Sequence, residues 1–128
     1  MGKRQMRQAV AYLRSNDGSA KKLAAQRDLI NAWAARTEVH ISGWHLDFAS
    51  GNAETARHTG LCEAVAELKA RRAELLVVAR PHLLTRSLSQ MIEVLGILRV
   101  VGAEVCSADG AELSWPFLEH IAQHSGLA

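Results

Sequence analysis

The sequence of 128 residues contains little cysteine, no long hydrophobic run and little net charge. Its two cysteines, Cys62 and Cys106, lie in apolar segments without the spacing of metal ligands. This predicts buried free thiols in a reducing compartment and excludes a disulfide scaffold. No apolar run approaches the roughly 18–20 residues of a membrane-spanning helix, and no basic-then-apolar leader opens the chain. We therefore expect a cytoplasmic protein that makes no membrane contact.

The net charge of +2 is small, because a dedicated nucleic-acid binder usually carries a stronger basic excess. Basic residues are nevertheless concentrated before Asp28, where only Asp17 opposes them: Lys3, Arg4, Arg7, Arg14, Lys21, Lys22 and Arg27. Such a segment is able to meet a phosphate backbone, although basic surface residues are often only solvated. The charge distribution therefore leaves association with DNA open.

Two periodicities alternate along the chain, and their order predicts an α/β fold. Short apolar runs predict strands over 9–13, 39–48, 74–79 and 103–107, whereas three- and four-residue spacings predict helices over 21–37, 59–72, 87–101 and 112–124. This order predicts a three-layer domain with a mainly parallel sheet of four or five strands and helices on both faces. The length fits one domain over residues 1–128, without a separate DNA-binding domain.

In folds of this kind, ligands bind beyond the carboxyl ends of the strands. Four arginines lie at or near these predicted ends: Arg14, Arg57, Arg80 and Arg86. A guanidinium group suits phosphate because it offers paired donors and stays charged. Phosphate binding and plain surface charge are both consistent with this pattern. Strand alternation places Arg14 on the same side as Asn16 and turns Ser15 to the other face.

No other motif points to a cofactor or metal. Residues 18–21 (Gly-Ser-Ala-Lys) lack the spacing of a phosphate-binding loop. Of the six histidines, only His120 and His124 are spaced to bind one metal ion from a single helix, and no third ligand is evident. Trp33 falls on the apolar side of its helix and is expected in the core. We therefore expect no metal, no cofactor and no small-molecule substrate.

Taken in order, five segments resemble the amino-terminal catalytic domain of the serine recombinases, the resolvase/invertase family. The segments and the family patterns are Tyr12-Leu13-Arg14 for Y-x-R-x-S, Leu23-Ala24-Ala25-Gln26-Arg27 for L-x-x-Q-R, Asp47-Phe48-Ala49-Ser50-Gly51 for D-x-x-S-G, Gly60-Leu61 for the end of R-x-G-L, and residues 77–87 for V-V-x-[KR]-L-D-R-L-x-R-S. The resemblance extends from about residue 9 to residue 122. It implies a resolvase-like fold and DNA cleavage by a serine hydroxyl, which attacks a phosphodiester and forms a 5′-phosphoserine link.

The resemblance breaks at the positions that carry this chemistry. Asn16 occupies the position of the nucleophilic serine, and an amide cannot attack phosphorus. His82-Leu83 replaces the Asp-Arg pair of the last motif, which removes an acid and an arginine that would stabilise the transition state. Arg57 lies three residues before Gly60, where the family has two. Recombination by this chain alone is therefore not expected.

The matching positions imply a set of phosphate- or DNA-binding residues without a catalytic nucleophile: Arg14, Gln26, Asp47, Ser50, Arg57 and Arg86. The leading hypothesis is an inactive resolvase-like domain that associates weakly and non-specifically with DNA, with a recombinase, or with itself as a homodimer. One alternative is an active recombinase that uses Ser15 or Ser19 as its nucleophile. The other is a protein-interaction module with a vestigial pocket.

Overall fold

The computed structural model describes residues 6–15, 19–48, 59–84 and 88–111. Its elements alternate as β1 (Arg7–Arg14), α1 (Ala20–Thr37), β2 (Val39–Asp47), α2 (Thr59–Lys69), β3 (Leu75–Val78), the short 3₁₀ helix η2 (Pro81–Leu83), α3 (Leu88–Val101) and β4 (Glu104–Ser107). The helix expected over 112–124, with His120 and His124, lies outside the described residues. No helix in the described part of the chain is both long and apolar enough to cross a membrane.

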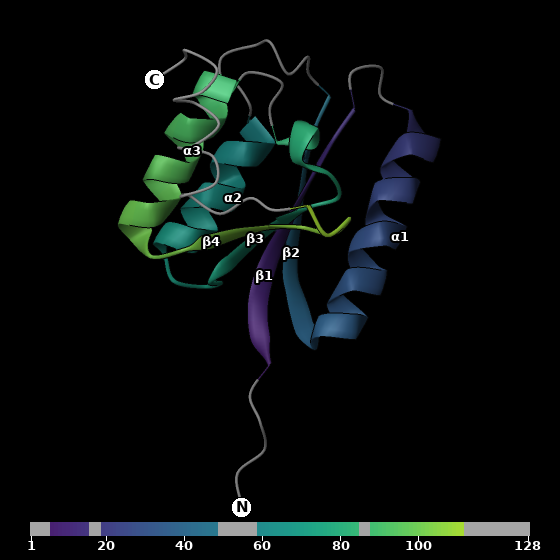
Figure 1. Ribbon diagram of the computed structural model, residues 1–128, viewed down its shortest axis with the longest axis horizontal. Helices are drawn as coiled ribbons and strands as arrows, with labels where there is room; N and C mark the ends of the chain where they lie inside the picture. Colours follow the sequence, from purple (N-terminus) through teal and green to yellow (C-terminus); the bar gives the residue numbers. More distant parts are fainter. Residues whose placement is uncertain (1–5, 16–18, 49–58, 85–87, 112–128) are drawn as a thin grey trace, which may run out of the picture.

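The four strands form one parallel sheet in the order β2-β1-β3-β4. Helix α1 covers one face, and α2 and α3 cover the other (Figure 1). The sequence prediction of a parallel sheet between helical layers is therefore confirmed. All four residues of β3 are buried, as expected for a central strand that is covered on both faces.

The alternation of β1 divides the core into two parts. Val10 and Tyr12 pack towards α2 and α3, whereas Ala9, Ala11 and Leu13 pack towards α1. Trp33 belongs to the core under α1, as expected. Nearly every residue of β1 is buried, and its side chains alternate between the two faces of the sheet. β1 therefore packs against both helical layers.

A β-bulge in β2 reverses which side chains face each helical layer. The pairing steps from Ala9 opposite Ile41 to Val10 opposite Gly43, so Ser42 is the additional residue. Before the bulge, the odd-numbered Val39 and Ile41 pack on the α1 side. After the bulge, odd-numbered residues face α2, and a Cβ on Gly43 would lie 2.7 Å from Glu67 Oε2. The bulge thereby turns the odd-numbered side chains at the end of β2 towards α2.

The prediction that both cysteines are buried is wrong. Cys62 is exposed, and Cys106 is only partly buried. Leu61 and Ala64 take the inward positions on α2, so the helical period turns Cys62 outward although its neighbours are apolar. Cys106 lies on the edge strand β4, which is covered less completely than β3. Desolvation by burial, followed by the charge of Glu104, raises the pKa of the Cys106 thiol.

Candidate functional site

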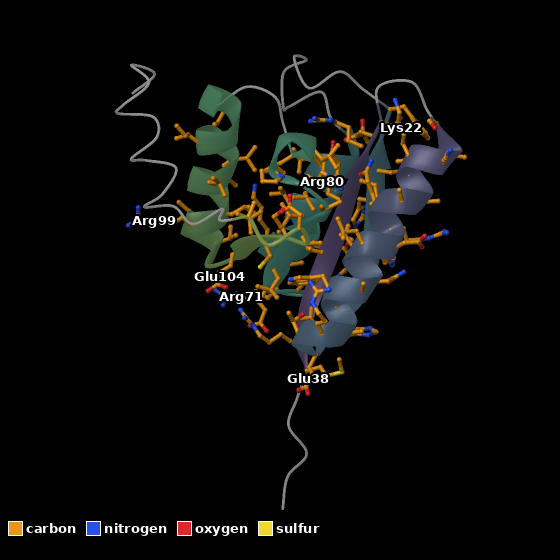
Figure 2. The ribbon with its side chains drawn as sticks, turned by 45° about the vertical axis from the view of Figure 1, so that its right-hand side comes forward. Lys22, Glu38, Arg71, Arg80, Arg99 and Glu104 are labelled. Atoms are coloured by element: carbon orange, nitrogen blue, oxygen red, sulfur yellow. The ribbon has the colours of Figure 1, made fainter. Side chains whose placement is uncertain are left out.

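A cavity of about 790 Å³ opens at the carboxyl end of β1, on the side of the sheet covered by α1. Its described lining comes from the end of β1, from α1 and from the segment after β3: Arg14, Ser15, Lys22, Ala25, Gln26, Asp28, Leu29, Ala32, Ala79, Arg80 and Leu83. This volume is within the range of ligand sites, and the position is the one expected from the topology. Lys22 and Arg80 lie at this end of the molecule, away from Glu38 at the start of β2 (Figure 2).

Gln26 joins α1 to β1 at the wall of this cavity. The Arg14 N–H donates to Gln26 Oε1 at 3.1 Å, and Gln26 Nε2 donates to the Arg14 carbonyl at 2.8 Å. β3 pairs only with residues 9–11 of β1. Beyond them, the side-chain amide of Gln26 makes the hydrogen bonds with the β1 backbone that a neighbouring strand would otherwise make. Gln26 is buried. Its amide therefore stabilises the backbone of β1, a role that the motif alone did not indicate.

The two serines that the sequence offered as nucleophiles both take part in the start of α1. Ser15 is 4% exposed, and its hydroxyl accepts a hydrogen bond from the Ser19 N–H at 3.2 Å. Ser19 is the N-cap of α1, and its hydroxyl accepts from the Lys22 N–H at 3.3 Å. A capping hydroxyl satisfies a backbone donor that the helix cannot satisfy itself. Each hydroxyl thus stabilises the turn between β1 and α1.

Asp47 lies at the amino terminus of α2. Its carboxylate accepts hydrogen bonds from the Gly60 N–H at 2.8 Å, the Leu61 N–H at 3.1 Å and the Tyr12 hydroxyl at 2.8 Å. A negative charge at this position also interacts favourably with the helix dipole. The start of α2 lies so close to β2 that a Cβ on Gly60 would be 2.4 Å from the Leu46 carbonyl oxygen. Asp47 therefore joins β1, β2 and α2.

Tyr12 and Arg14 lie on the same side of β1 as this carboxylate. Burial, followed by the hydrogen bond to Asp47, raises the pKa of the Tyr12 hydroxyl well above its ordinary range, and the positive charge of Arg14 opposes this shift. Arg14 is opposite Asp47 in the β1–β2 register and only 2% exposed. The Arg14 guanidinium is therefore a buried cation on the α2 side, whereas Ser15 follows on the cavity side.

Two exposed cations, Lys22 and Arg80, line the cavity at this end of the sheet. Arg80 influences Asp109, which follows β4. Desolvation would raise the pKa of the Asp109 carboxyl, but hydrogen bonds from Ser107 and the Ala111 N–H, with the charge of Arg80, outweigh it and lower the pKa. Lys22 was not selected from the sequence as a site residue. A signal was available, because the first turn of a helix that follows a strand lies at the carboxyl edge of the sheet.

Four sequence-predicted site residues, Asn16, Ser50, Arg57 and Arg86, lie outside the described residues. Leu83, at the family's arginine position, is partly buried and lines the cavity. Among the described residues, no group of histidine, cysteine and carboxylate side chains is arranged to hold a metal ion. His45 of β2 contacts Glu67 of α2 through Nε2, which adds another link between the strand and the helix.

Comparison with known proteins agrees with this architecture. The family model described as "Resolvase, N terminal domain" matches residues 9–125. The chain is similar to the crystal structure of the N-terminal catalytic domain of TP901-1 integrase, with a TM-score of 0.79, 13% identity, and coverage of 94% of this chain and 95% of that one. Comparison with curated protein sequences gives no match.

Two further solved structures are similar. One is a resolvase family site-specific recombinase from Streptococcus pneumoniae, with a TM-score of 0.72, 17% identity, and coverage of 94% of this chain and 88% of that one. The other is the C-terminal catalytic domain of ISC1926 TnpA, an IS607-like serine recombinase, with a TM-score of 0.70, 18% identity, and coverage of 91% and 79%. At these identities the structural similarity establishes the fold, and the family model covers most of the chain. The chain therefore belongs to the resolvase N-terminal domain family, the catalytic-domain family of the serine recombinases.

Proposed function

We propose that this chain is a resolvase-type domain that contacts DNA phosphates without cleaving DNA. The observation that carries the proposal is the position of Ser15, the hydroxyl nearest to Asn16 in the sequence. Ser15 is 4% exposed, its hydroxyl accepts the Ser19 N–H, and strand alternation turns its side chain to the other face from that of Arg14. A nucleophile of this family would need a hydroxyl within about 3–3.5 Å of a phosphorus atom that arginines also contact.

Two other features support the loss of cleavage. The position of the serine nucleophile is Asn16, and Leu83 occupies the position of a transition-state arginine. Removing a nucleophile or a group that stabilises developing charge costs several orders of magnitude in rate. Ser19 is an unsuitable replacement, because its hydroxyl is engaged as the cap of α1.

Phosphate contact is supported by the cations at the carboxyl edge. Lys22 and Arg80 are exposed, and both line the cavity at the end of β1. Arg86 follows η2 in the sequence and matches the family pattern, so it is included in the proposed phosphate surface. Gln26 and Asp47 are not, because their polar atoms are hydrogen-bonded within the fold. Arg14 then acts as a buried positive charge beside this surface.

The test is a fluorescence anisotropy titration with a mixed-sequence duplex at about 50 mM and about 200 mM salt, followed by a denaturing gel. The wild type is compared with Arg80→Gln/Arg86→Gln, with Ser15→Ala and with Ser19→Ala. We expect salt-sensitive binding that the double substitution weakens, without a covalent band. A covalent protein–DNA band that Ser15→Ala or Ser19→Ala abolishes would establish the active-recombinase alternative. Wild-type binding that the double substitution leaves unchanged would overturn the proposed surface.

A second candidate function, association with another protein, is favoured by the edge strand β2. Trp44 and Leu46 of this strand, and Phe48 just beyond it, are 38%, 43% and 59% exposed. An exposed apolar edge strand is able to pair with another chain. The candidate predicts self-association of the purified protein, which sedimentation equilibrium measures. A monomer at every concentration would leave the DNA-binding proposal as the better description.

A further inference from the structure

A second basic surface lies at the opposite end of the sheet from the proposed phosphate surface. A hollow of about 340 Å³ is formed where α2 turns into β3 and α3 turns into β4. Arg71 and Arg72 line it together with Gln8, Glu74 and the backbone around Gly102. Both arginines are exposed. Figure 2 shows Arg71 at the same end of the molecule as Glu38 and Glu104, away from Lys22 and Arg80.

Helices α2 and α3 end with the same hydrogen-bond pattern but with different residues at the critical position. In α2, the Arg71 N–H donates to the Leu68 carbonyl and the Arg72 N–H to the Glu67 carbonyl. In α3, the Gly102 N–H donates to the Arg99 carbonyl and the Ala103 N–H to the Leu98 carbonyl. This is the Schellman motif, which places its C′ residue in the left-handed region and therefore favours glycine.

The C′ residue of α3 is Gly102, with φ of +78°, whereas that of α2 is Arg71, with φ of +60°. A residue with a Cβ is rarely found in this conformation, because its side chain crowds the backbone. Arginine at this position is therefore a cost to the fold that glycine would avoid. A residue in an unfavourable backbone conformation is a reason to look for a function of its side chain.

The neighbouring carboxylates leave both arginines available. Arg7 binds Glu74 through Nε at 3.4 Å and Glu104 through a terminal nitrogen at 3.2 Å. The hydrogen bond with Glu104, together with the charge of Glu74, raises the pKa of Arg7. Arg71 and Arg72 line the hollow, and neither forms an ion pair with another of the described residues.

We propose that Arg71 and Arg72 form a second DNA-contacting surface, which binds the phosphate backbone of a duplex. Arg71 and Arg72 are adjacent in the sequence and line the same hollow. Guanidinium groups offer the paired donors that phosphate oxygens accept, and contacts with the DNA backbone require charge and hydrogen bonds without sequence readout. The choice of DNA as the polyanion rests on the proposed function, but the surface shares no residue with the Lys22–Arg80 edge. Substitutions at the two ends should therefore act independently.

The decisive variant is Arg71→Gly, because it moves stability and binding in opposite directions. Removal of the Cβ relieves the left-handed conformation, so the melting temperature should rise by a few degrees. Loss of one phosphate contact should lower the magnitude of the salt slope of DNA binding by about one, and Arg71→Gly/Arg72→Gln should lower it by about two. A purely structural role for Arg71 predicts the change in melting temperature without the change in slope.

Two variants serve as matched controls in the same duplex titration. Arg36→Gln removes an exposed cation from the last turn of α1, outside the hollow. Glu38→Gly relieves a second left-handed residue, with φ of 56°, without removing a cation. We expect both controls to retain the wild-type salt slope. An equal loss with Arg36→Gln would overturn the proposal, since it would show unlocalised attraction.

The same titration separates this inference from the proposed function. If Arg80→Gln/Arg86→Gln weakens binding and Arg71→Gly/Arg72→Gln does not, the second surface is wrong and the first remains. If only the Arg71 and Arg72 variants weaken binding, the second surface stands and the carboxyl edge is not the anchor. Losses in salt slope that add in the combined variant establish both. No binding by the wild-type protein at either salt concentration would overturn both.

Discussion

Replacement of Asp47 by alanine should weaken the attachment of α2 to the strands, because the Asp47 carboxylate joins three elements. It accepts the Gly60 and Leu61 N–H groups at the start of α2 and the Tyr12 hydroxyl of β1. Loss of a helix cap costs about 0.5–2 kcal/mol. A buried hydroxyl left without its acceptor costs about 1–3 kcal/mol. We therefore expect Asp47→Ala to lower the free energy of unfolding by about 2–4 kcal/mol.

Urea denaturation followed by far-ultraviolet circular dichroism measures this loss. With a slope of about 2 kcal/mol/M, in the usual range for a small domain, the midpoint should fall by about 1–2 M. Asp28→Ala is the matched control, because Asp28 is an exposed carboxylate on α1. Its effect should stay within about 0.5 kcal/mol. If Asp47→Ala has no larger effect than this control, the carboxylate does not join the elements as described.

A double-mutant cycle identifies the part that belongs to Tyr12. Tyr12→Phe removes the hydroxyl and leaves both helix N–H groups bonded to Asp47. If the contact between the hydroxyl and the carboxylate is direct, the two substitutions should be non-additive, with a coupling of about 0.5–3 kcal/mol. Strict additivity would contradict the 2.8 Å hydrogen bond on which this argument depends.

Four further outcomes are expected. Gln26→Ala should lower the free energy of unfolding by about 2–4 kcal/mol, because it leaves two buried backbone groups of Arg14 without partners, and an unchanged urea midpoint would contradict this role. Gly60→Ala should cost about 1–3 kcal/mol in the same assay, since its Cβ would overlap the Leu46 carbonyl; a neutral result would mean that α2 shifts freely. Tyr12 is the only tyrosine, so tyrosinate absorbance in the folded protein should be absent near pH 10 and appear only as the protein unfolds; normal titration would refute its raised pKa. Asn16→Ser alone should give no covalent DNA band on a denaturing gel, because the arginine position remains Leu83, and a band would show that the serine is sufficient.

The tyrosine titration also fixes the sign of one pH effect. The folded state raises the pKa of Tyr12, so the folded state holds its proton at pH values where the unfolded chain releases it. The associated stability is present below about pH 10, the unfolded pKa, and declines as the pH rises above it. Tyr12→Phe should therefore flatten the alkaline fall in stability that is expected of the wild-type protein.

Hydrophobic periodicity was sufficient to predict the layers of the fold. Strands such as β3 are apolar on both faces, and helices such as α1 carry one apolar side, so the order of elements followed directly. The residues at which the elements end were less predictable. Helix α2 was expected to reach Arg72 but ends at Lys69, because Arg71 adopts the conformation that glycine usually supplies. No glycine marked that end in the sequence.

The site was less accessible to sequence reasoning, because its geometry depends on a bulge. Uninterrupted alternation would place Asp47 on the same face as Val39, towards α1. The additional residue, Ser42, turns Asp47 towards α2 instead, and this bulge was not predicted from the sequence. The resemblance assigned Asp47 and Gln26 to phosphate. The structure shows their atoms hydrogen-bonded to backbone groups and to Tyr12, a structural role that only the three-dimensional contacts reveal, and their role towards phosphate stays a prediction.

These contacts explain why a chain can retain family motifs for structural reasons alone. Gln26, Asp47 and Gly60 each maintain the connection between a strand and a helix, so the fold requires them whether or not DNA is cut. The proposed loss of cleavage rests instead on Asn16 and Leu83, which the resemblance places at positions with a chemical role in the family. Retained motifs of the first kind are therefore evidence for the fold, and only residues of the second kind bear on activity. That distinction is why we infer DNA association first from the exposed cations Lys22 and Arg80, with Arg86 added from the family pattern.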